Sequence, residues 1–274
     1  MPAQGATISF SIFIASNTTR IWPSATASPA ATLMSIMVPG MGQVITVASG
    51  KGGVGKSTVT AGLCASLAHA GKRVLAIDAD AGLRGLDLLL GLEDEAVYDL
   101  SDVLGGRKRL SDAMIRHEGL GALFFLAAPL TPEDPCITEQ ALKTLFLHTG
   151  NAFDYIVIDS PSGLGALQSA LAAAADRVLL VTTPDPAAVR AAARASQALG
   201  GDQFLIINRI EPKLIRDKIL PHIDSIIDTV AVRLIGLIPE DRDAVRGKGE
   251  AAGIAMQNIA FRLAGEHRPL YRFW

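Results

Sequence analysis

The sequence predicts an α/β fold in three layers, α/β/α, with a mostly parallel twisted sheet in the middle. First, short apolar runs rich in β-branched residues alternate with longer segments of helical spacing from residue 43 onward. Second, 49% of the residues are hydrophobic but only 5% are aromatic, which suits buried parallel strands covered by alanine-rich helices. Third, a glycine-rich loop joins the first strand to the first helix. Strand–helix alternation implies right-handed crossovers, so helices are expected on both faces of the sheet.

The expected elements alternate along the whole of residues 43–274. Apolar runs predict strands at 43–49, 73–78, 120–127, 155–159, 177–182, 203–207 and 232–238. Helical spacing predicts helices at 57–70, 101–116, 138–148, 164–174, 187–199, 217–229 and 255–263. Because no repeat and no second core pattern is found, residues 43–274 are expected to form a single domain. Its ligands are expected at the carboxyl ends of the strands.

Residues 1–42 differ in composition from the rest of the chain. They are rich in Ser, Thr, Ala and Pro and carry one charge, Arg20. They lack the basic start of a secretory signal, and the apolar run 9–16 is too short to span a bilayer. Two interpretations remain open: a poorly ordered extension, or a non-native leader with translation beginning at Met41. We favour the second, because a start directly before a strand needs no leader.

Charge and cysteine content exclude several classes of protein. The net charge of −2 provides no global basic field that would recruit nucleic acid. Cys64 and Cys136 are too far apart in the sequence for a C-x-x-C pair, and a reducing cytosol is the expected compartment. The five histidines are scattered, and no metal-ligand cluster or Ser-His-Asp arrangement is found.

Residues 50–58 carry the clearest chemical signal, Gly-Lys-Gly-Gly-Val-Gly-Lys-Ser-Thr, which fits the phosphate-binding pattern G-x-x-x-x-G-K-[ST]. Backbone amides must turn inward around a polyphosphate there, and side chains would obstruct them at Gly52, Gly53 and Gly55. Lys56 can reach the terminal phosphates, and the Ser57 hydroxyl can ligate Mg²⁺. The motif therefore predicts a P-loop NTPase-type fold that binds a nucleoside triphosphate.

Two predicted strands end in aspartate at the edge where the nucleotide is expected. Asp78 and Asp159 each follow four apolar residues, and a carboxylate is costly to bury there unless it faces a cation or strong donors. Asp159, and less directly Asp78, is therefore expected in the Mg²⁺ shell, while Asp80 is expected to orient the attacking water. The alternative for all three is a turn or a helix cap.

Lys51 is an additional lysine directly after the first glycine of the loop. Because that loop position tolerates any residue, a solvated lysine is one interpretation. The other is that Lys51 crosses a dimer interface and neutralises charge on the partner's phosphates, as an arginine finger does.

The loop and the strand ends together resemble the MinD/ParA class of ATPases. Residues 51–58 resemble its deviant Walker A motif, and within the class the MinD family is the most similar. Residues 77–88 and 159–163 resemble its two switch segments, and further similarity is found at 97–100, 236–241 and 265–269. The resemblance covers residues 43 to about 270.

This resemblance implies an ATPase that uses ATP and Mg²⁺ and forms a homodimer with ATP. It also implies placement of the division site, recruitment of a division inhibitor, and a second protein that stimulates hydrolysis. The location implied is cytoplasmic, with peripheral binding to the inner face of the cell membrane. The residues that match are Lys51 and Asp80 for catalysis; Gly50, Gly52, Gly53, Val54, Gly55, Lys56, Ser57 and Thr58 for phosphate; and Ser57, Asp78 and Asp159 for metal.

Asn208 and Pro239 follow or end strands and are candidates for contact with the base. Asn208 is expected to read the adenine edge, with a strand-end turn as the alternative, and Pro239 to pack on the base. A guanine-selective N-K-x-D pattern is missing at 208–211, which favours adenine.

One departure from the family concerns the C-terminus. MinD-like chains usually end in a basic amphipathic helix, but Pro269 and the five residues after it cannot build one. Binding to the membrane surface is therefore left open. A flagellar-number regulator, a partition ATPase and a scaffold without turnover are the alternatives. DNA is not expected, because nearby basic residues in the C-terminal half are few: Arg209, Lys213, Arg216 and Lys218.

Overall fold

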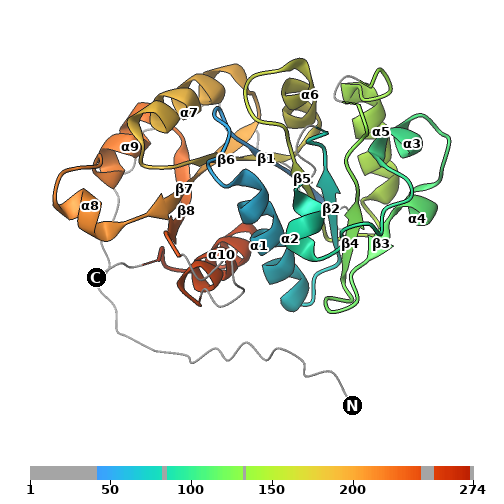
Figure 1. The fold of residues 1–274 in the computed structure, drawn as a ribbon, viewed down its shortest axis with the longest axis horizontal. Coiled ribbons are helices and arrows are strands. Elements are labelled where there is room, and N and C mark those ends of the chain that lie inside the picture. The colour runs from blue at the N-terminus through green and yellow to red at the C-terminus, as the bar shows by residue number, and fades with distance from the viewer. Residues whose placement is uncertain (1–41, 82–84, 132–133, 242–249, 272–274) are drawn as a thin grey trace, which may run out of the picture. The chain divides into compact units, whose positions relative to one another are not determined.

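A single sheet of eight strands organises the part of the chain that the structure, a computed structural model, describes: residues 42–81, 85–131, 134–241 and 250–271 (Figure 1). The strand order is β3-β4-β2-β5-β1-β6-β7-β8. All neighbouring pairs are parallel except β3 and β4, which are antiparallel. The strands are β1 (Gln43–Ala48), β2 (Val74–Asp78), β3 (Ile115–Arg116), β4 (Leu123–Leu126), β5 (Tyr155–Asp159), β6 (Arg177–Thr182), β7 (Asp202–Ile210) and β8 (Arg233–Pro239).

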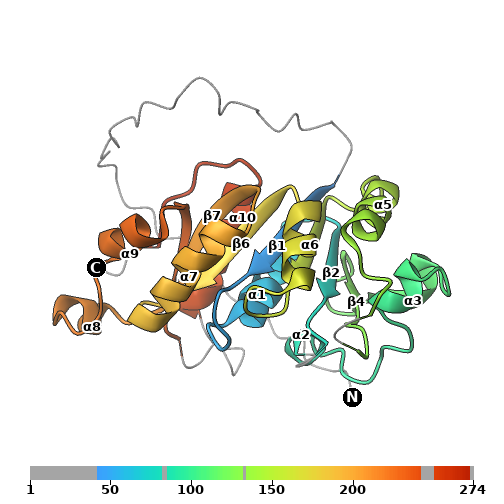
Figure 2. The same ribbon diagram turned by 90° about the horizontal axis from the view of Figure 1, so that it is seen from above.

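Helices cover both faces of this sheet, as Figures 1 and 2 show. One face carries α1 (Lys56–His69) and α10 (Glu250–Leu263), which pack against each other. The other carries α5 (Glu139–Thr149), α6 (Ala166–Ala174), α7 (Pro186–Ala198) and α9 (Ile223–Val230). Short helices occupy connections: α2 (Leu86–Leu90), α3 (Leu100–Leu104), α4 (Leu110–Ala113) and α8 (Pro212–Arg216). The predicted three-layer fold is confirmed.

The central strands are buried on both faces, which explains why they read as continuous apolar runs. In β1, Ile45 and Val47 join the core beneath α1 and α10, while Val44 and Ala48 join cores on the opposite face. Successive side chains of a strand point to opposite faces, so one apolar run serves two cores. All seven predicted strand segments coincide with strands of the structure.

The prediction of one helix at 101–116 is wrong. The structure has α3, then α4, and then β3, which pairs with β4 as an antiparallel edge strand. Gly105 and Gly106 directly follow α3, and Gly106 adopts φ 69°. Glycine ends helices readily, because positive φ carries no steric cost for it.

The prediction of one helix at 217–229 is also wrong in its first half. The helix α9 begins only at Ile223, after Pro221, and His222 caps it by accepting from the Asp224 amide. Proline disfavours helical conformation in the residue before it, so a helix cannot run smoothly through 217–221. The short helices α8 and α2 were not predicted from the sequence. The predictions for residues 1–42 lie outside the described residues, apart from Gly42.

Candidate functional site

The loop between β1 and α1 has the conformation that the phosphate-binding pattern requires. Gly53 and Gly55 adopt φ of 77° and 89°, in the left-handed region that favours glycine. A Cβ at Gly55 would also lie 2.4 Å from Nδ2 of Asn208. At Gly50 a Cβ would lie 2.1 Å from the Ala191 carbonyl oxygen of α7. Glycine is therefore needed for loop shape at Gly55 and for close packing at Gly50.

The helix α1 presents an open N-terminus at the end of this loop. Its N-cap, Gly55, provides no side-chain hydrogen bond, and its first turn contains no acidic residue. Backbone amides of a first helical turn have no partner within the helix, and the helix dipole favours an anion there. Lys56, Ser57 and Thr58 form this turn, with Lys56 buried, Ser57 half-buried and Thr58 exposed. The arrangement is suited to bind phosphate.

A buried ion pair links this turn to the end of β5. Nζ of Lys56 donates to Oδ1 of Asp159 over 2.8 Å, and the two side chains are only 7% and 1% exposed. Oγ1 of Thr60, one turn further along α1, donates to the same oxygen over 3.3 Å. Oδ2 of Asp159 is buried and has no hydrogen-bond partner. A buried carboxylate oxygen without a donor is a place where a cation or its water fits.

Asp78 lies beside Asp159, because the two residues pair in the parallel register of β2 and β5. Its carboxylate accepts from the amides of Asp80 over 2.9 Å and Leu86 over 3.2 Å. Burial, with a further contribution from the charge of Asp159, raises the pKa of Asp78 to about 7. Two acids therefore meet at the strand ends, as the sequence predicted.

Asp80 is half-buried at the same edge, two residues beyond the end of β2. Its amide, bonded to Asp78, anchors the start of the segment that leads to α2. Residues 82–84 of this segment lie outside the described residues. The role of Asp80 in orienting water stays a prediction.

Lys51 is bonded within its own chain. Its Nζ donates over 2.9 Å to Oδ2 of Asp185, which also accepts from the Ala188 amide and so caps α7. The hydrogen bond from Lys51, followed by that from Ala188, lowers the pKa of the Asp185 carboxyl. The lysine and aspartate side chains are 49% and 46% exposed, and an ion pair of this kind contributes little stability. The contact can therefore be exchanged readily for another.

Asn208 contacts the phosphate loop in this structure. It lies in β7, is 6% exposed, and donates from Nδ2 to the Val54 carbonyl over 2.9 Å. Pro239 ends β8 and pairs in register with Ile210 of β7. The site residues predicted from sequence thus all lie at one edge of the sheet. The role of Asn208 in reading the adenine edge stays a prediction.

Comparisons with known proteins match this geometry. A family model described as ParA, NUBPL iron-transfer P-loop NTPase, matches residues 40–211. The septum site-determining protein MinD of Synechocystis sp. is 39% identical over 248 residues, 85% of this chain and 93% of that protein. This chain belongs to the MinD family. It is a MinD-type P-loop ATPase, and the resemblance predicted from the sequence is confirmed.

Solved MinD structures share the fold over most of the chain. The MinC:MinD cell division protein complex of Aquifex aeolicus contains a chain with a TM-score of 0.75 and 33% identity, covering 85% of this chain and 100% of that one. The septum site-determining protein MinD of Pyrococcus horikoshii OT3, complexed with Mg-ADP, has a TM-score of 0.70 and 27% identity and covers 81% and 96%. In the Aquifex aeolicus complex, the MinD chain is assembled with MinC.

The described part of this MinD-type chain differs from metal-cluster, disulfide and membrane-spanning proteins. It contains no group of three or more His, Cys, Asp or Glu side chains that could hold a metal ion. Both cysteines are free: Cys64 is buried on α1, and Cys136 is half-buried before α5. None of the described helices combines the length and apolarity that crossing a bilayer would take.

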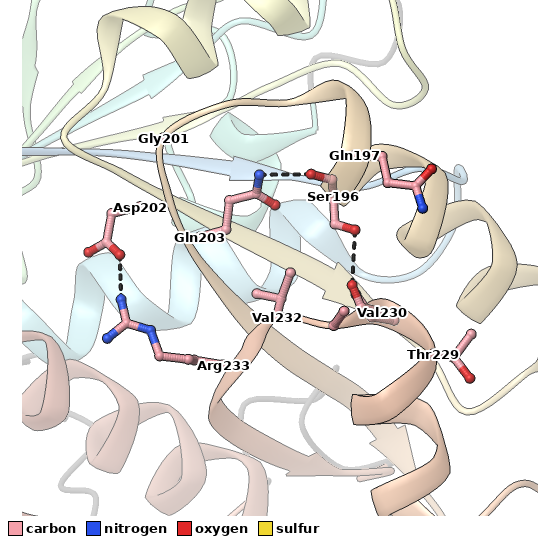
Figure 3. A pocket seen from close by; sticks show the side chains of 10 residues that line it. Ser196, Gln197, Gly201, Asp202, Gln203, Thr229, Val230, Val232 and Arg233 are labelled. Carbon is pink, nitrogen blue, oxygen red and sulfur yellow. Dashed lines mark hydrogen bonds and ion pairs between the residues drawn. The ribbon is translucent and has the colours of Figure 1, made fainter. Parts of the chain in front are cut away.

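A hollow of about 420 Å³ lies at the amino ends of β7 and β8, away from the phosphate loop (Figure 3). Several polar side chains of its wall bond to other residues of that wall. Nε2 of Gln203 donates to the Ser196 carbonyl over 3.0 Å, Oγ of Ser196 donates to the Val230 carbonyl over 2.9 Å, and Arg233 pairs with Asp202. Oε1 of Gln203 has no partner, but it is buried and offers the hollow no acceptor. We assign no function to this hollow.

Three polar residues near the loop were missed by the sequence analysis: Thr60, Asp185 and Gln168. Thr60 lies four residues after Lys56 and could have been found by helical spacing. Asp185 stands before Pro186, a signature of a helix start that was not used. Gln168 is a polar residue on the apolar stripe of an alanine-rich helix, and that mismatch was its signal.

Proposed function

We propose that this MinD-type chain binds ATP with Mg²⁺ at the carboxyl edge of the sheet and hydrolyses it as a homodimer. The observation that carries the proposal is the buried Lys56–Asp159 pair at the open N-terminus of α1. A positive charge, a carboxylate with an unused oxygen and a row of backbone amides converge there. Binding of the β- and γ-phosphates would give Lys56 a new anionic partner and leave Asp159 free for the metal shell.

The metal would be held by few protein groups. Ser57 would supply a hydroxyl and Asp159 a carboxylate, while Asp78 would support the shell from the neighbouring strand. Mg²⁺ usually retains waters and takes remaining ligands from the substrate phosphates, so a closed cluster of protein ligands is not required. When bound, the ion would neutralise charge on the phosphates. The unpartnered Oδ2 of Asp159 supports this assignment.

Hydrolysis needs a group that orients water and a charge that stabilises the transferring phosphoryl group. We assign the first role to Asp80 at the end of β2. We assign the second to Lys51 of the opposite protomer, whose pairing with Asp185 is exposed and weak. Dimerisation would then complete each site with a cation that one protomer alone does not provide.

The remaining site residues would hold the rest of the nucleotide. The amides of Gly50, Gly52, Gly53, Val54, Gly55 and Thr58 would surround the phosphates. Asn208 would fix the loop through Val54 and lie close to the base, and Pro239 would pack against the base. ATP is the proposed nucleotide.

The cellular role proposed is the placement of the division site, in the cytoplasm and peripherally at the inner face of the cell membrane. The ATP-bound dimer would recruit a division inhibitor, and another protein would stimulate hydrolysis. DNA binding is not part of this proposal, because exposed Lys213, Arg216 and Lys218 near α8 are interspersed with acidic Glu211 and Asp217, so this part of the described surface is not broadly basic. Co-sedimentation with anionic liposomes and with duplex DNA, each with ATP and with ADP, tests this role. Retention on DNA alone would favour a partition ATPase.

ATP hydrolysis by wild type, Lys51→Ala and a control, Lys143→Ala, tests the mechanism. Lys143 is an exposed lysine of α5 paired with Glu139, so its loss should leave turnover unchanged. We expect Lys51→Ala to lower turnover to background, roughly a thousandfold if the lysine acts as an arginine finger does. Unchanged turnover in Lys51→Ala would remove this assignment.

Mixing variants decides which protomer donates the lysine. A mixed dimer of Lys51→Ala and Asp80→Ala has one site with both groups only if the lysine acts across the interface. Since half of randomly formed dimers are mixed and each has one complete site, activity should return to about a quarter of wild type. A mixture as inactive as its components would place Lys51 in its own site. Sedimentation with a non-hydrolysable ATP analogue checks the dimer itself.

A further inference from the structure

Gln168 is a fully buried polar residue on the apolar face of α6. Its side chain is 0% exposed, and its neighbours on the helix are mostly alanine and leucine. A primary amide at such a position must be held by hydrogen bonds, since burying it unpaired is costly.

The two hydrogens of one amide nitrogen reach two different segments. Nε2 of Gln168 donates to the Ser49 carbonyl over 3.1 Å and to the Pro161 carbonyl over 3.3 Å. Ser49 directly precedes the phosphate loop, and Pro161 belongs to the turn after β5. Because both partners are acceptors, the nitrogen must face them, and the orientation of the amide is determined.

Ser49 joins this amide to the rest of the site. Its carbonyl also accepts from the Gly163 amide over 3.1 Å, and its hydroxyl donates to the Lys51 carbonyl over 3.0 Å. Ser160 donates from its amide and hydroxyl to the Val47 carbonyl at the end of β1. The loop that carries Lys51 and the turn that follows Asp159 are thus bonded to each other, with Gln168 behind both.

The amide is only partly needed to satisfy its two acceptors. The Ser49 carbonyl keeps the Gly163 amide as a donor, while the single hydroxyl hydrogen of Ser160 is shared between the Val47 and Pro161 carbonyls. Oε1 of Gln168, meanwhile, is buried without any partner. An apolar residue of the same shape would avoid this unmade bond, so the glutamine is a local cost to the fold. Such local inconsistencies are expected where function, not stability, determines the residue.

We propose that Gln168 is a positioning residue for ATP hydrolysis, which holds the entry of the phosphate loop and the turn 160–163 in fixed register. It touches no substrate and acts through Ser49 and Pro161. The inference rests on the proposed nucleotide site. Because the loop and the turn reach the phosphates from two different strands, their relative position sets the alignment of the reacting groups, on which the rate depends steeply.

The test compares wild type with Gln168→Met and Gln168→Leu in steady-state ATP hydrolysis, with urea unfolding of each. Ser169→Ala is the control, because Ser169 is the exposed next residue and bonds only within α6. We expect kcat to fall about tenfold in both glutamine variants, with KM within about twofold and the urea midpoint equal or higher. Ser169→Ala should match wild type.

A second readout does not depend on turnover. Hydrogen exchange at the Gly163 amide should be faster in Gln168→Met than in wild type, because its acceptor Ser49 loses a restraint. Equal kcat in wild type and Gln168→Met, or unchanged exchange at Gly163, would overturn the proposal. So would a kcat loss that only follows a lowered urea midpoint. If wild type did not hydrolyse ATP, the proposed ATPase mechanism would be refuted instead. Hydrogen exchange at Gly163 would still test whether Gln168 holds the phosphate loop and the turn 160–163 together.

Discussion

The two edges of the sheet offer hollows of opposite character. At the carboxyl edge, the cavity lined by Asp78 is only about 120 Å³, yet it adjoins a buried ion pair and a carboxylate oxygen without a partner. At the amino edge, the hollow beside Gln203 is about 420 Å³, and its wall contains hydrogen bonds of Gln203 and Ser196 and the pair of Asp202 with Arg233 (Figure 3). A carboxylate with an unused oxygen beside a buried cation, rather than volume, therefore distinguishes the functional edge.

Sheet topology produces this difference. In a parallel sheet, every strand ends and every following helix begins at the same edge. The N-terminus of α1, and the carboxylates that end β2 and β5, are consequently gathered at the carboxyl edge. The amino edge receives helix ends of the opposite polarity, such as those of α7 and α9 around Ser196 and Thr229.

Lys56→Met should produce the largest effect, because it disrupts both the ion pair and the phosphate site at the carboxyl edge. It removes the phosphate-binding cation and leaves Asp159 buried without its partner, which should lower the free energy of unfolding by about 3 kcal/mol. Binding of a fluorescent ATP analogue should fall below detection. Urea unfolding and a fluorescence titration measure the two losses.

The matched change at the amino edge is Arg233→Met. Arg233 pairs with Asp202 at the surface, and its side chain is 70% exposed. Its loss should change the free energy of unfolding by less than about 1 kcal/mol and leave nucleotide binding intact. If Lys56→Met and Arg233→Met lost equal stability and equal nucleotide affinity, the two edges of the sheet would not differ in function.

Gly55→Ala and Gly201→Ala compare two glycines of nearly equal φ, 89° and 90°. Each alanine variant should be less stable than wild type by about 1 kcal/mol, because a left-handed backbone conformation strains any residue with a Cβ. At Gly55 the new Cβ must also displace Asn208 from Val54, whereas at Gly201 the nearest atom is 3.8 Å away. We expect nucleotide affinity to fall at least about tenfold in Gly55→Ala only. Calorimetric titration with ATP decides this, and a similar fall in Gly201→Ala would contradict it.

Asp78→Asn should change the pH dependence of stability without nucleotide, and leave the loop and the ion pair in place. Because burial raises the pKa of Asp78 to about 7, the folded state holds its proton over a pH range in which the unfolded state has lost it. Folding therefore loses stability through this group as pH rises from about 4 to about 7. Urea unfolding across this range should show a shallower decline for Asp78→Asn. If the stability of wild type and Asp78→Asn changed equally with pH, the pKa of Asp78 would not be raised.

Local spacing was enough to predict much of the site. The glycine pattern predicted where positive φ is needed, as at Gly55, and apolar runs ending in aspartate predicted Asp78 and Asp159. Two predicted helices were wrong where glycine or proline, at Gly105 and Pro221, overrides apolar spacing. The periodicity of such segments does not reveal where a backbone turns.

Residue spacing was enough to predict the phosphate loop, the strand ends and the layers, because these depend on periods of two and 3.6 residues and on the lack of a Cβ in glycine. The partner of each polar group could not be predicted in this way and follows from how distant segments pack together. Lys51 meets Asp185 across 134 residues, Gln168 meets Ser49 across 119, and Asn208 meets Val54 across 154. A hydrogen bond depends on distance and direction in space, and packing of the sheet and helices sets both.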